Sequence, residues 1–286
     1  MRSVLITGAS SGFGAKAGVE LARRGWHVFA SMRDTSKSGY VRHLADASGV
    51  EPDAISVIEL DVTSESSRQS GVKHLLSASP SGPDMILHCA GYTTASFFED
   101  IPPAKIRHLF DTNFFGALDI TQKLLPSMRE RRSGTIAVIS SNAVNIAHPM
   151  YSIYAAAKWA LEGWAEALEI ELAPFNLDVK IIQPGNHDTN FGSNVELMID
   201  ESSAYSDLAA LALPRMEKLG GKARSADKAT REICDALELS RRKLRTRIGS
   251  DDKLMAALSR WAPYSTRRIL IEKITGITAG TKVPAK

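Results

Sequence analysis

Short apolar runs, many of them rich in valine and isoleucine, alternate along the chain with longer stretches in which apolar residues recur every three or four positions. The short runs predict β-strands at residues 3–8, 27–32, 54–62, 84–91, 135–141, 177–185 and 244–249. The longer stretches predict helices at residues 12–25, 67–79, 103–134 (one long helix, straight or bent), 150–175 and 225–238. Because the strands are apolar almost throughout, both faces of the sheet must be covered, and the alternation predicts a doubly wound parallel sheet of the α/β class.

The composition and the hydrophobic periodicity of the chain change after the sixth predicted strand. Residues 186–222 are polar, rich in serine and only partly periodic. A long insert after the carboxyl end of a strand predicts a lid over that edge of the sheet. Residues from about 250 to 286 predict one or two further helices, a C-terminal helical extension. No stretch resembles a linker, so we expect residues 1–286 to form a single domain.

The composition limits the possible functions. Hydrophobic residues make up 44% of the chain and charged residues 23%, as in a globular protein with a sizeable core. The formal net charge of +3 is too small to predict a nucleic-acid partner. Cys89 and Cys234 lie far apart and predict free thiols in a reducing compartment. We recognise neither a signal peptide nor an integral membrane segment, so we expect a cytoplasmic protein, and we expect no metal site.

A glycine-rich turn follows the first predicted strand, where residues 7–14 read T-G-A-S-S-G-F-G. Gly8 permits a tight turn, Gly12 lets the backbone approach a pyrophosphate, and Gly14 lets the helix pack close to the strand. Free N–H groups at the start of the helix can then bind phosphates. The spacing differs from the common G-x-G-x-x-G, and an ordinary strand–helix turn is the alternative. At the first crossover of an alternating chain, however, this turn predicts a dinucleotide site in a Rossmann-type sheet.

The end of the second strand distinguishes between the two nicotinamide dinucleotides. An acid there binds the ribose 2′-hydroxyl, whereas an arginine accommodates a 2′-phosphate. Met32 stands at the acid position, Arg33 follows it, and Asp34 comes next. This order predicts NADP(H) in preference to NAD(H), with a solvated loop charge as the alternative for Arg33. Asp61, after the third strand, can accept a bond from the adenine amine or cap a turn.

A tyrosine and a lysine one turn apart indicate the chemistry. Tyr154 and Lys158 share a face of the predicted helix, whereas Tyr151 has no lysine at the matching position. A phenol with a pKa near 10 is a usable proton donor at neutral pH, and a neighbouring ammonium stabilises its phenolate. Ser141 ends the fifth predicted strand. Because ligands bind beyond the carboxyl ends of parallel strands, the Ser141 hydroxyl and Tyr154 can meet at one substrate carbonyl.

Taken together, these segments resemble the short-chain dehydrogenase/reductase family, in its short single-domain branch. The matching segments are TGASSGFG at 7–14, LDV at 60–62, CAG at 89–91, Asn113 in DTNFFG, Ser141, YAAAK at 154–158, and Pro184-Gly185 with Thr189. The resemblance implies that Tyr154 exchanges the proton and that Lys158 lowers the pKa of Tyr154 and binds the nicotinamide ribose. It implies that Ser141 polarises the substrate oxygen and that Asn113 positions a water next to Lys158. A residue at a helix bend is the alternative for Asn113.

The resemblance also implies the residues that bind the cofactor. They are Gly8, Ser10, Ser11, Gly12, Phe13, Gly14, Arg33, Asp61, Val62, Ala90, Gly91, Tyr154, Lys158, Pro184, Gly185 and Thr189. Thr189 would bind the nicotinamide carboxamide. The chain departs from the family at Cys89, where asparagine is usual, which leaves open how the central strands are tied together. We expect a buried structural cysteine there rather than a reactive thiol.

These features predict an NADP(H)-dependent oxidoreductase that reduces a ketone or aldehyde, or oxidises an alcohol. The apolar residues of the lid predict a fairly apolar small-molecule substrate. His148 and His187 can each contact a substrate oxygen or lie solvated in a loop. The alternatives are a non-catalytic dinucleotide-binding regulator and an enzyme that acts on C=N or C=C bonds or as an isomerase.

The chain offers two further surfaces for interaction. In many members of the family the helices that match residues 103–130 and 150–174 form a subunit interface, so the resemblance implies a homodimer or homotetramer. The basic and apolar residues 265–277 predict a lid helix or a subunit-packing helix. Peripheral contact with a membrane is the alternative for that stretch.

Overall fold

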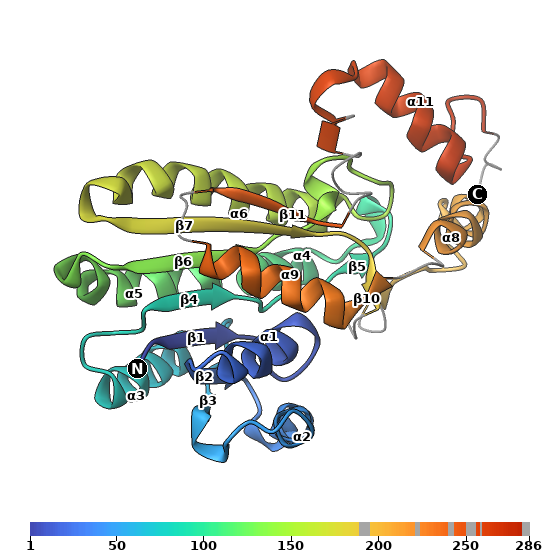
Figure 1. Cartoon of the computed structure of the whole chain (residues 1–286). Coiled ribbons are helices and arrows are strands. Elements are labelled where there is room, and N and C mark those ends of the chain that lie inside the picture. The colour runs from blue at the N-terminus through green and yellow to red at the C-terminus, as the bar shows by residue number, and fades with distance from the viewer. Residues whose placement is uncertain (189–194, 221–223, 240–242, 250–255, 258, 282–286) are drawn as a thin grey trace.

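A parallel sheet forms the centre of the protein. The computed structural model describes residues 1–188, 195–220, 224–239, 243–249, 256–257 and 259–281. The strands are β1 (Ser3–Thr7), β2 (His27–Met32), β3 (Ile55–Glu59), β4 (Met85–His88), β6 (Gly134–Ile139), β7 (Leu177–Pro184) and β11 (Arg245–Ile248). They lie in the order β11-β7-β6-β4-β1-β2-β3, and every neighbouring pair is parallel. All the strands predicted from the sequence are present, and the predicted Rossmann-type sheet is confirmed (Figure 1).

The strand order reverses at the centre of the sheet. The chain starts at β1, moves outward to β2 and β3, and then returns to β4 on the other side of β1. The carboxyl ends of β1 and β4 therefore flank the point where connections leave in opposite directions. Open parallel sheets bind their ligands at this switch point. The glycine-rich turn follows β1 here, and the segment from Cys89 to Gly91 follows β4.

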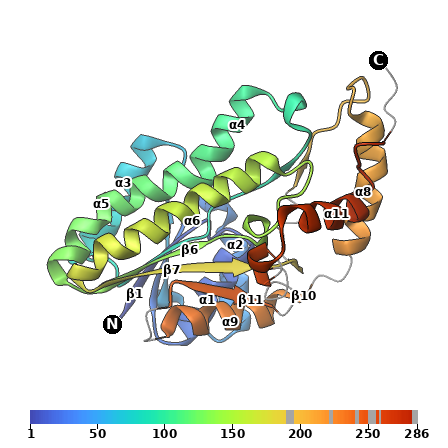
Figure 2. The same cartoon turned by 90° about the horizontal axis from the view of Figure 1, so that it is seen from above.

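Helices cover both faces of the sheet, as the apolar strands require (Figure 2). One face carries α1 (Gly12–Arg23), α2 (Gly39–Ala47) and α9 (Ala226–Glu238). The other carries α3 (Glu65–Ala78), α4 (Pro103–Phe110), α5 (Gly116–Arg131) and α6 (Ser152–Leu172). The helix predicted over 103–134 runs without a break from Pro103 to Arg131, three residues short of its predicted end, and a π-helical turn at Asp111–Phe115 joins α4 to α5. The sequence analysis missed α2.

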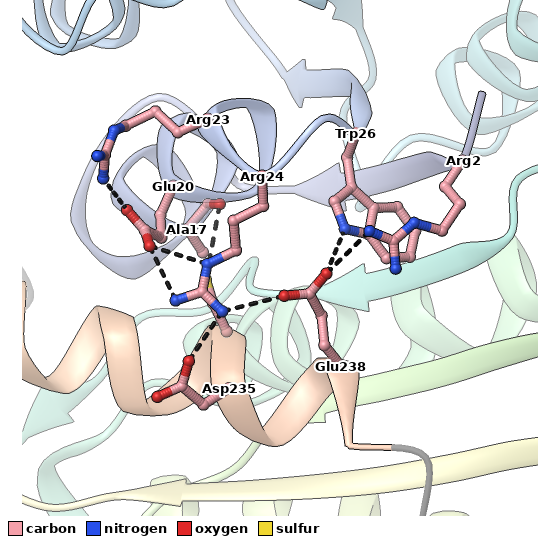
Figure 3. A network of polar contacts seen from close by, with 9 residues as sticks. Arg2, Ala17, Glu20, Arg23, Arg24, Trp26, Asp235 and Glu238 are labelled. Atoms are coloured by element: carbon pink, nitrogen blue, oxygen red, sulfur yellow. Dashed lines mark hydrogen bonds and ion pairs between the residues drawn. The ribbon is translucent and has the colours of Figure 1, made fainter.

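A network of polar side chains fastens α9 to α1 (Figure 3). Its members, called the α1–α9 cluster below, are Arg2, Glu20, Arg24, Trp26, Asp235 and Glu238. Arg24 bonds to Glu20 on its own helix at 2.8 Å and to Glu238 on α9 at 3.0 Å. Glu238 also accepts a bond from Trp26 Nε1 at 2.9 Å, which joins the start of β2 to the end of α9.

The insert after β7 and the C-terminal segment lie beyond the carboxyl ends of the strands. They supply α8 (Ser206–Gly220) and α11 (Tyr264–Thr275), which lie beside each other in both views (Figures 1 and 2). Two short strands, β5 (Thr94–Ala95) and β9 (Glu196–Leu197), pair in parallel and tie the insert to the segment that follows β4. Likewise β8 (His187–Asp188) pairs with β10 (Arg224–Ser225). Among the described helices, none is long and apolar enough to cross a membrane.

Candidate active site

The glycine-rich turn requires glycine at two positions and has an open third one. Gly8 has φ +69°, and a Cβ there would lie 2.7 Å from Ala90 Cα. A Cβ on Gly14 would overlap the Gly8 carbonyl oxygen, so only glycine lets α1 start this close to β1. Gly12 has φ +56° and faces open space. Ser11 precedes α1 without a side-chain cap to its N–H groups, so the helix start can bind an anion in the way the sequence predicts.

The segment after β7 faces this turn. The Phe13 ring makes an edge contact with the His187 ring, with 5.7 Å between centroids. His187 is 8% exposed, and its Nδ1 bonds to the Gly185 carbonyl oxygen at 3.0 Å. Pro184 ends β7 and Gly185 follows it, so both stand at the carboxyl edge of the sheet. His187 therefore joins this segment to the glycine-rich turn. Thr189 lies outside the residues that the structure describes.

Arg33 and its neighbours stand where the end of β2 meets the adenosine side of the predicted dinucleotide site. Met32 is buried, whereas Arg33 is exposed. In the described part of the chain, no hydrogen bond or ion pair holds the Arg33 guanidinium. The Asp34 carboxylate accepts bonds from Ser36 N at 3.0 Å and from Ser36 Oγ at 2.6 Å, which lower its pKa. Asp34 is thus engaged in capping the next turn.

Asp61 and Val62 follow β3. Asp61 Oδ1 accepts bonds from Thr63 N at 2.9 Å and from Thr63 Oγ1 at 2.8 Å, so the turn-capping alternative is observed. Contact with an adenine stays a prediction. Val62 is buried against the start of α5, where a Cβ on Gly116 would lie 2.7 Å from Val62 Cβ.

Thr7 ties the central strands together next to Cys89. Its Oγ1 accepts bonds from the N–H groups of Cys89 and Ala90, each at 3.2 Å. The substitution of cysteine for the usual asparagine therefore leaves a link between the ends of β1 and β4. Burial raises the pKa of the Cys89 thiol to about 12, so it is neutral at physiological pH. Such a thiol is a poor nucleophile.

Asn113 lies in the π-helical turn and holds the segment that follows Gly91. Its Oδ1 accepts a bond from Tyr92 N at 2.9 Å, and its Nδ2 donates to Tyr92 O at 2.8 Å. A Cβ on Gly91 would lie 2.8 Å from Asn113 Oδ1 and 3.5 Å from Lys158 Nζ, so these three residues meet. π-helical turns often occur at functional sites. The structure supports a positioning role for the Asn113 side chain, and the bound water stays a prediction.

Ser141, Tyr154 and Lys158 come together at the carboxyl edge of β6. The Tyr154 side chain is hydrogen-bonded to Ser141. Lys158 Nζ donates to the Ile139 carbonyl oxygen at 2.9 Å and lies 5.9 Å from the centroid of the Tyr154 ring. Tyr154 is 7% exposed and Lys158 is 5% exposed. Tyr151 precedes the first turn of α6, and of the two tyrosines it is Tyr154 that meets the serine and the lysine.

Burial sets the protonation states of Tyr154 and Lys158. It raises the pKa of Tyr154 to about 12, while the bond from Ser141 acts in the opposite direction. It lowers the pKa of Lys158 to about 8, against the influence of Cys89 and Glu162. The Cys89 thiol is neutral, whereas the Glu162 carboxylate forms an ion pair with Arg245 at 3.0 Å. A protonated phenol beside a mostly protonated ammonium can donate a proton to a bound oxygen.

The sequence analysis missed two residues that organise the site. One is Thr7, whose position directly before Gly8 was the available signal. The other is Glu162, which is buried one turn after Lys158 and gave no signal apart from its spacing. Of the two candidate histidines, His187 bonds to the backbone of Gly185. His148 is half-buried, and burial lowers its pKa, which favours the neutral ring.

Comparison with known proteins agrees with this geometry. The sequence profile of the short chain dehydrogenase family matches residues 2–199. The "Uncharacterized oxidoreductase YusZ" of Bacillus subtilis is 34% identical over 278 residues, which cover 94% of this chain and 96% of that protein. The 3-ketodihydrosphingosine reductase of Bacteroides thetaiotaomicron is 30% identical over 264 residues, which cover 91% of this chain and 93% of the reductase.

A solved structure extends the comparison to the whole fold. A short-chain dehydrogenase from Streptomyces avermitilis superposes with a TM-score of 0.80 at 31% identity, covering 95% of each chain. The range matched by the profile, residues 2–199, includes the glycine-rich turn, Asn113, Ser141, Tyr154 and Lys158 of this chain. The chain belongs to the short-chain dehydrogenase/reductase family of oxidoreductases.

Proposed function

We propose that this protein is an NADP(H)-dependent reductase of ketones or aldehydes. The observation that carries the proposal is the meeting of the Tyr154 hydroxyl with Ser141 while Lys158 is held beside them on the Ile139 carbonyl. When bound, the reduced nicotinamide would supply the hydride to the carbonyl carbon. Tyr154 would donate its proton to the carbonyl oxygen, and Ser141 would hold that oxygen by a hydrogen bond.

The protonation states favour reduction as the working direction. With its pKa raised to about 12, Tyr154 is a protonated donor at neutral pH. Alcohol oxidation needs the phenolate and would require a positive charge to stabilise it. Lys158 supplies that charge while it is protonated, and in the reductive direction it would stabilise the phenolate left after Tyr154 has donated its proton. Tyr154 could also donate the proton in the reduction of a C=N or C=C bond. Compounds with these bonds are therefore the alternative substrates.

The end of β2 supports a preference for the 2′-phosphorylated cofactor. The buried Met32 offers no carboxylate for a ribose 2′-hydroxyl, and the Asp34 carboxylate caps the following turn. The exposed Arg33 guanidinium can pair with a phosphate through charge-assisted hydrogen bonds.

Apolar side chains near the catalytic helix support an apolar substrate. Met150 and Tyr151, which directly precede α6, pack in one cluster with Ala209 and Ala212 of α8. The cluster also includes Ala95, Phe97, Val195, Ile199, Leu213, Met216 and Ile277. The lid predicted over 186–222 thus presents apolar groups beside the start of the helix that carries Tyr154. A ketone on a lipid-like chain, the kind of substrate that the name of the Bacteroides relative indicates, is consistent with an apolar insert at this edge of the sheet.

The outer face of α4, α5 and α6 supports a homodimer or homotetramer. Phe115, Trp159 and Ile170 are 53%, 59% and 70% exposed there. A hollow of about 480 Å³ on the same face is lined by Pro103, Ile106, Arg107, Phe110, Asp111 and Phe115. A second copy of the chain would cover these apolar groups.

A panel of aliphatic and aromatic ketones and aldehydes, with NADPH or NADH as reductant, tests the proposal. We expect consumption of NADPH with at least one apolar carbonyl compound and slower turnover with NADH. Tight binding of NADPH with no turnover on any carbonyl, imine or activated alkene would favour a non-catalytic regulator. Turnover that is equally fast in Tyr154→Phe would exclude the proposed proton donor.

A further inference from the structure

A buried carboxylate on α6 connects the parts of the site. Glu162 is 6% exposed. Its Oε1 accepts bonds from Ser140 Oγ at 2.5 Å and from Gln183 Nε2 at 2.7 Å, and its Oε2 accepts a bond from Arg245 Nε at 3.0 Å. These four residues, called the Glu162 cluster below, come from α6, the end of β6, β7 and β11, which are neighbours in the fold (Figure 1). They are separated by up to 105 positions in sequence, from Ser140 to Arg245.

Three of the four members of the cluster lie next to a part of the site, in sequence or on α6. Ser140 precedes Ser141, whose hydroxyl meets Tyr154. Gln183 precedes Pro184, where the chain turns toward the nicotinamide side of the predicted cofactor site. Glu162 itself follows Lys158 by one helical turn. A shift of the Glu162 carboxylate would therefore move the serine, the lysine and the segment after β7 relative to one another.

The cluster also has an energetic cost that a purely structural role does not explain. A buried charge is costly to desolvate, and well-packed apolar residues of similar volume often stabilise a fold as well or better. Arg245 offsets the charge of Glu162, and its other end bonds to the more exposed Glu166 at 2.5 Å. An acid at position 162 has an effect that an apolar residue lacks, because the negative charge of Glu162 raises the pKa of Lys158 and so favours its protonated form.

The groups around Lys158 show why this charge matters. From α6 it is faced by Tyr154 and Glu162, from the end of β4 by Cys89, and from the π-helical turn by Asn113. Tyr154 and Cys89 are both neutral at pH 7, since burial raises the pKa of each to about 12. Asn113 does not titrate. Of these four neighbours, Glu162 alone is a carboxylate, and it is held in an ion pair with Arg245.

We propose that Glu162 is a positioning residue that holds Ser141, Lys158 and the Pro184 segment in register and keeps Lys158 protonated through its negative charge. The inference rests on the proposed function, because it assigns Glu162 a part in the proton donation by Tyr154. It differs from that function in predicting an effect on kcat and on its pH dependence from a residue that touches neither substrate nor cofactor.

The test compares Glu162→Gln with Glu166→Gln as the matched control. Both substitutions remove a carboxylate that bonds to Arg245, but only Glu162 reaches Ser140 and Gln183. In Glu162→Gln we expect kcat to fall by about 10- to 100-fold, the loss that a small misplacement of reacting groups causes, with the Kd for NADPH changed less than about threefold. The alkaline limb of the kcat profile should move to lower pH, because Lys158 loses its negative neighbour. Glu162→Asp, which keeps the charge, should keep that limb in place.

Several outcomes would overturn the inference. Wild-type kcat and pH profile in Glu162→Gln would do so, and so would equal losses in Glu162→Gln and Glu166→Gln. If Glu162→Gln does not fold, Ser140→Ala removes one bond of the cluster and should still lower kcat by about three- to tenfold; an unchanged kcat there contradicts the proposal.

Two readouts separate this inference from the proposed function. Activity of wild type and of Tyr154→Phe tests the function alone. A crystal structure of Glu162→Gln needs no substrate and shows whether the bond from Lys158 Nζ to the Ile139 carbonyl, 2.9 Å in the wild type, is lost or lengthened as expected. An unmoved Lys158 and Ser141 in that structure would reject the positioning role whatever the reaction proves to be.

Discussion

The substitution Tyr154→Phe isolates one oxygen atom of the site. The Tyr154 ring packs among Leu109, Ala143, Ala155 and Ala157, and phenylalanine keeps all of these contacts. The lost hydroxyl bonds to Ser141, so the expected cost in stability is about 1 kcal/mol, the usual net value of one such bond. The fold and the binding of NADPH should therefore survive the change.

The expected effect on turnover is much larger than the effect on stability. With a pKa of about 12, the Tyr154 phenol is almost wholly protonated at pH 7, so its removal deletes the proton donor itself. General acid catalysis contributes roughly 10²- to 10⁴-fold, which corresponds to about 3 to 5 kcal/mol of activation free energy. We expect kcat for carbonyl reduction to fall by that factor.

The assay follows the loss of NADPH absorbance at saturating cofactor, with binding measured separately by NADPH fluorescence. Tyr151→Phe is the matched control, because Tyr151 lies just before the same helix without the lysine one turn away. It should retain kcat within about threefold, as expected of a change outside the proton path. A Tyr154→Phe enzyme that is within threefold of wild type, or a Tyr151→Phe enzyme that loses more, would refute the assignment.

Three further predictions follow from charges in the structure. Arg33→Ala should raise the Kd for NADPH by about 10- to 100-fold but leave the Kd for NADH within threefold, by fluorescence titration; equal losses would reject the 2′-phosphate contact. The kcat/KM for NADPH, which reports on the free enzyme, should fall above about pH 8 as Lys158 loses its proton, and a profile flat to pH 10 would contradict this. Glu238→Gln should lower the unfolding free energy by about 1 to 2 kcal/mol at pH 7 in urea titrations. Contacts with Trp26 and Arg24 depress the pKa of Glu238 despite its partial burial. The stabilisation by Glu238 is therefore present above about pH 4.5 and is lost as the pH falls through the depressed pKa of the folded state. A difference in unfolding free energy from wild type that persists in full at pH 3 would refute this linkage.

The sequence predicted the sheet well because its signals are local. Each buried strand is a continuous apolar run, and each crossover helix carries its own periodicity. The same local logic brought together Ser141 and Tyr154, since each stands at the carboxyl end of a strand or at the start of the helix that follows. The glycine-rich turn was equally readable, because a Cβ on Gly14 would overlap the Gly8 carbonyl within the turn and Gly8 itself adopts φ +69°. The close approach of Gly8 to Ala90 is distant in sequence and was not predicted.

What escaped prediction depends on partners that are distant in sequence. Strands β5 and β9 have two residues each, too few for any periodicity, and their pairing fixes where the insert begins. Glu162 reads as an ordinary polar position on a long helix until Ser140, Gln183 and Arg245 are placed around it. The tie that Thr7 provides at Cys89 depends in the same way on two strands that meet only in the folded sheet.

Two buried or partly buried glutamates now stand at opposite edges of the sheet, and they should behave differently. Glu238 bonds to Arg2 and Trp26, which directly precede β1 and β2, so the α1–α9 cluster lies at the amino edge. Glu162 bonds to residues that directly precede Ser141 and Pro184, at the carboxyl edge where ligands bind. If the sheet separates folding from chemistry in this way, Glu238→Gln lowers stability with little change in kcat, and Glu162→Gln lowers kcat beyond what its change in stability explains. A loss of kcat that scales with the loss of stability in both variants would mean that Glu162 acts only by holding the fold together.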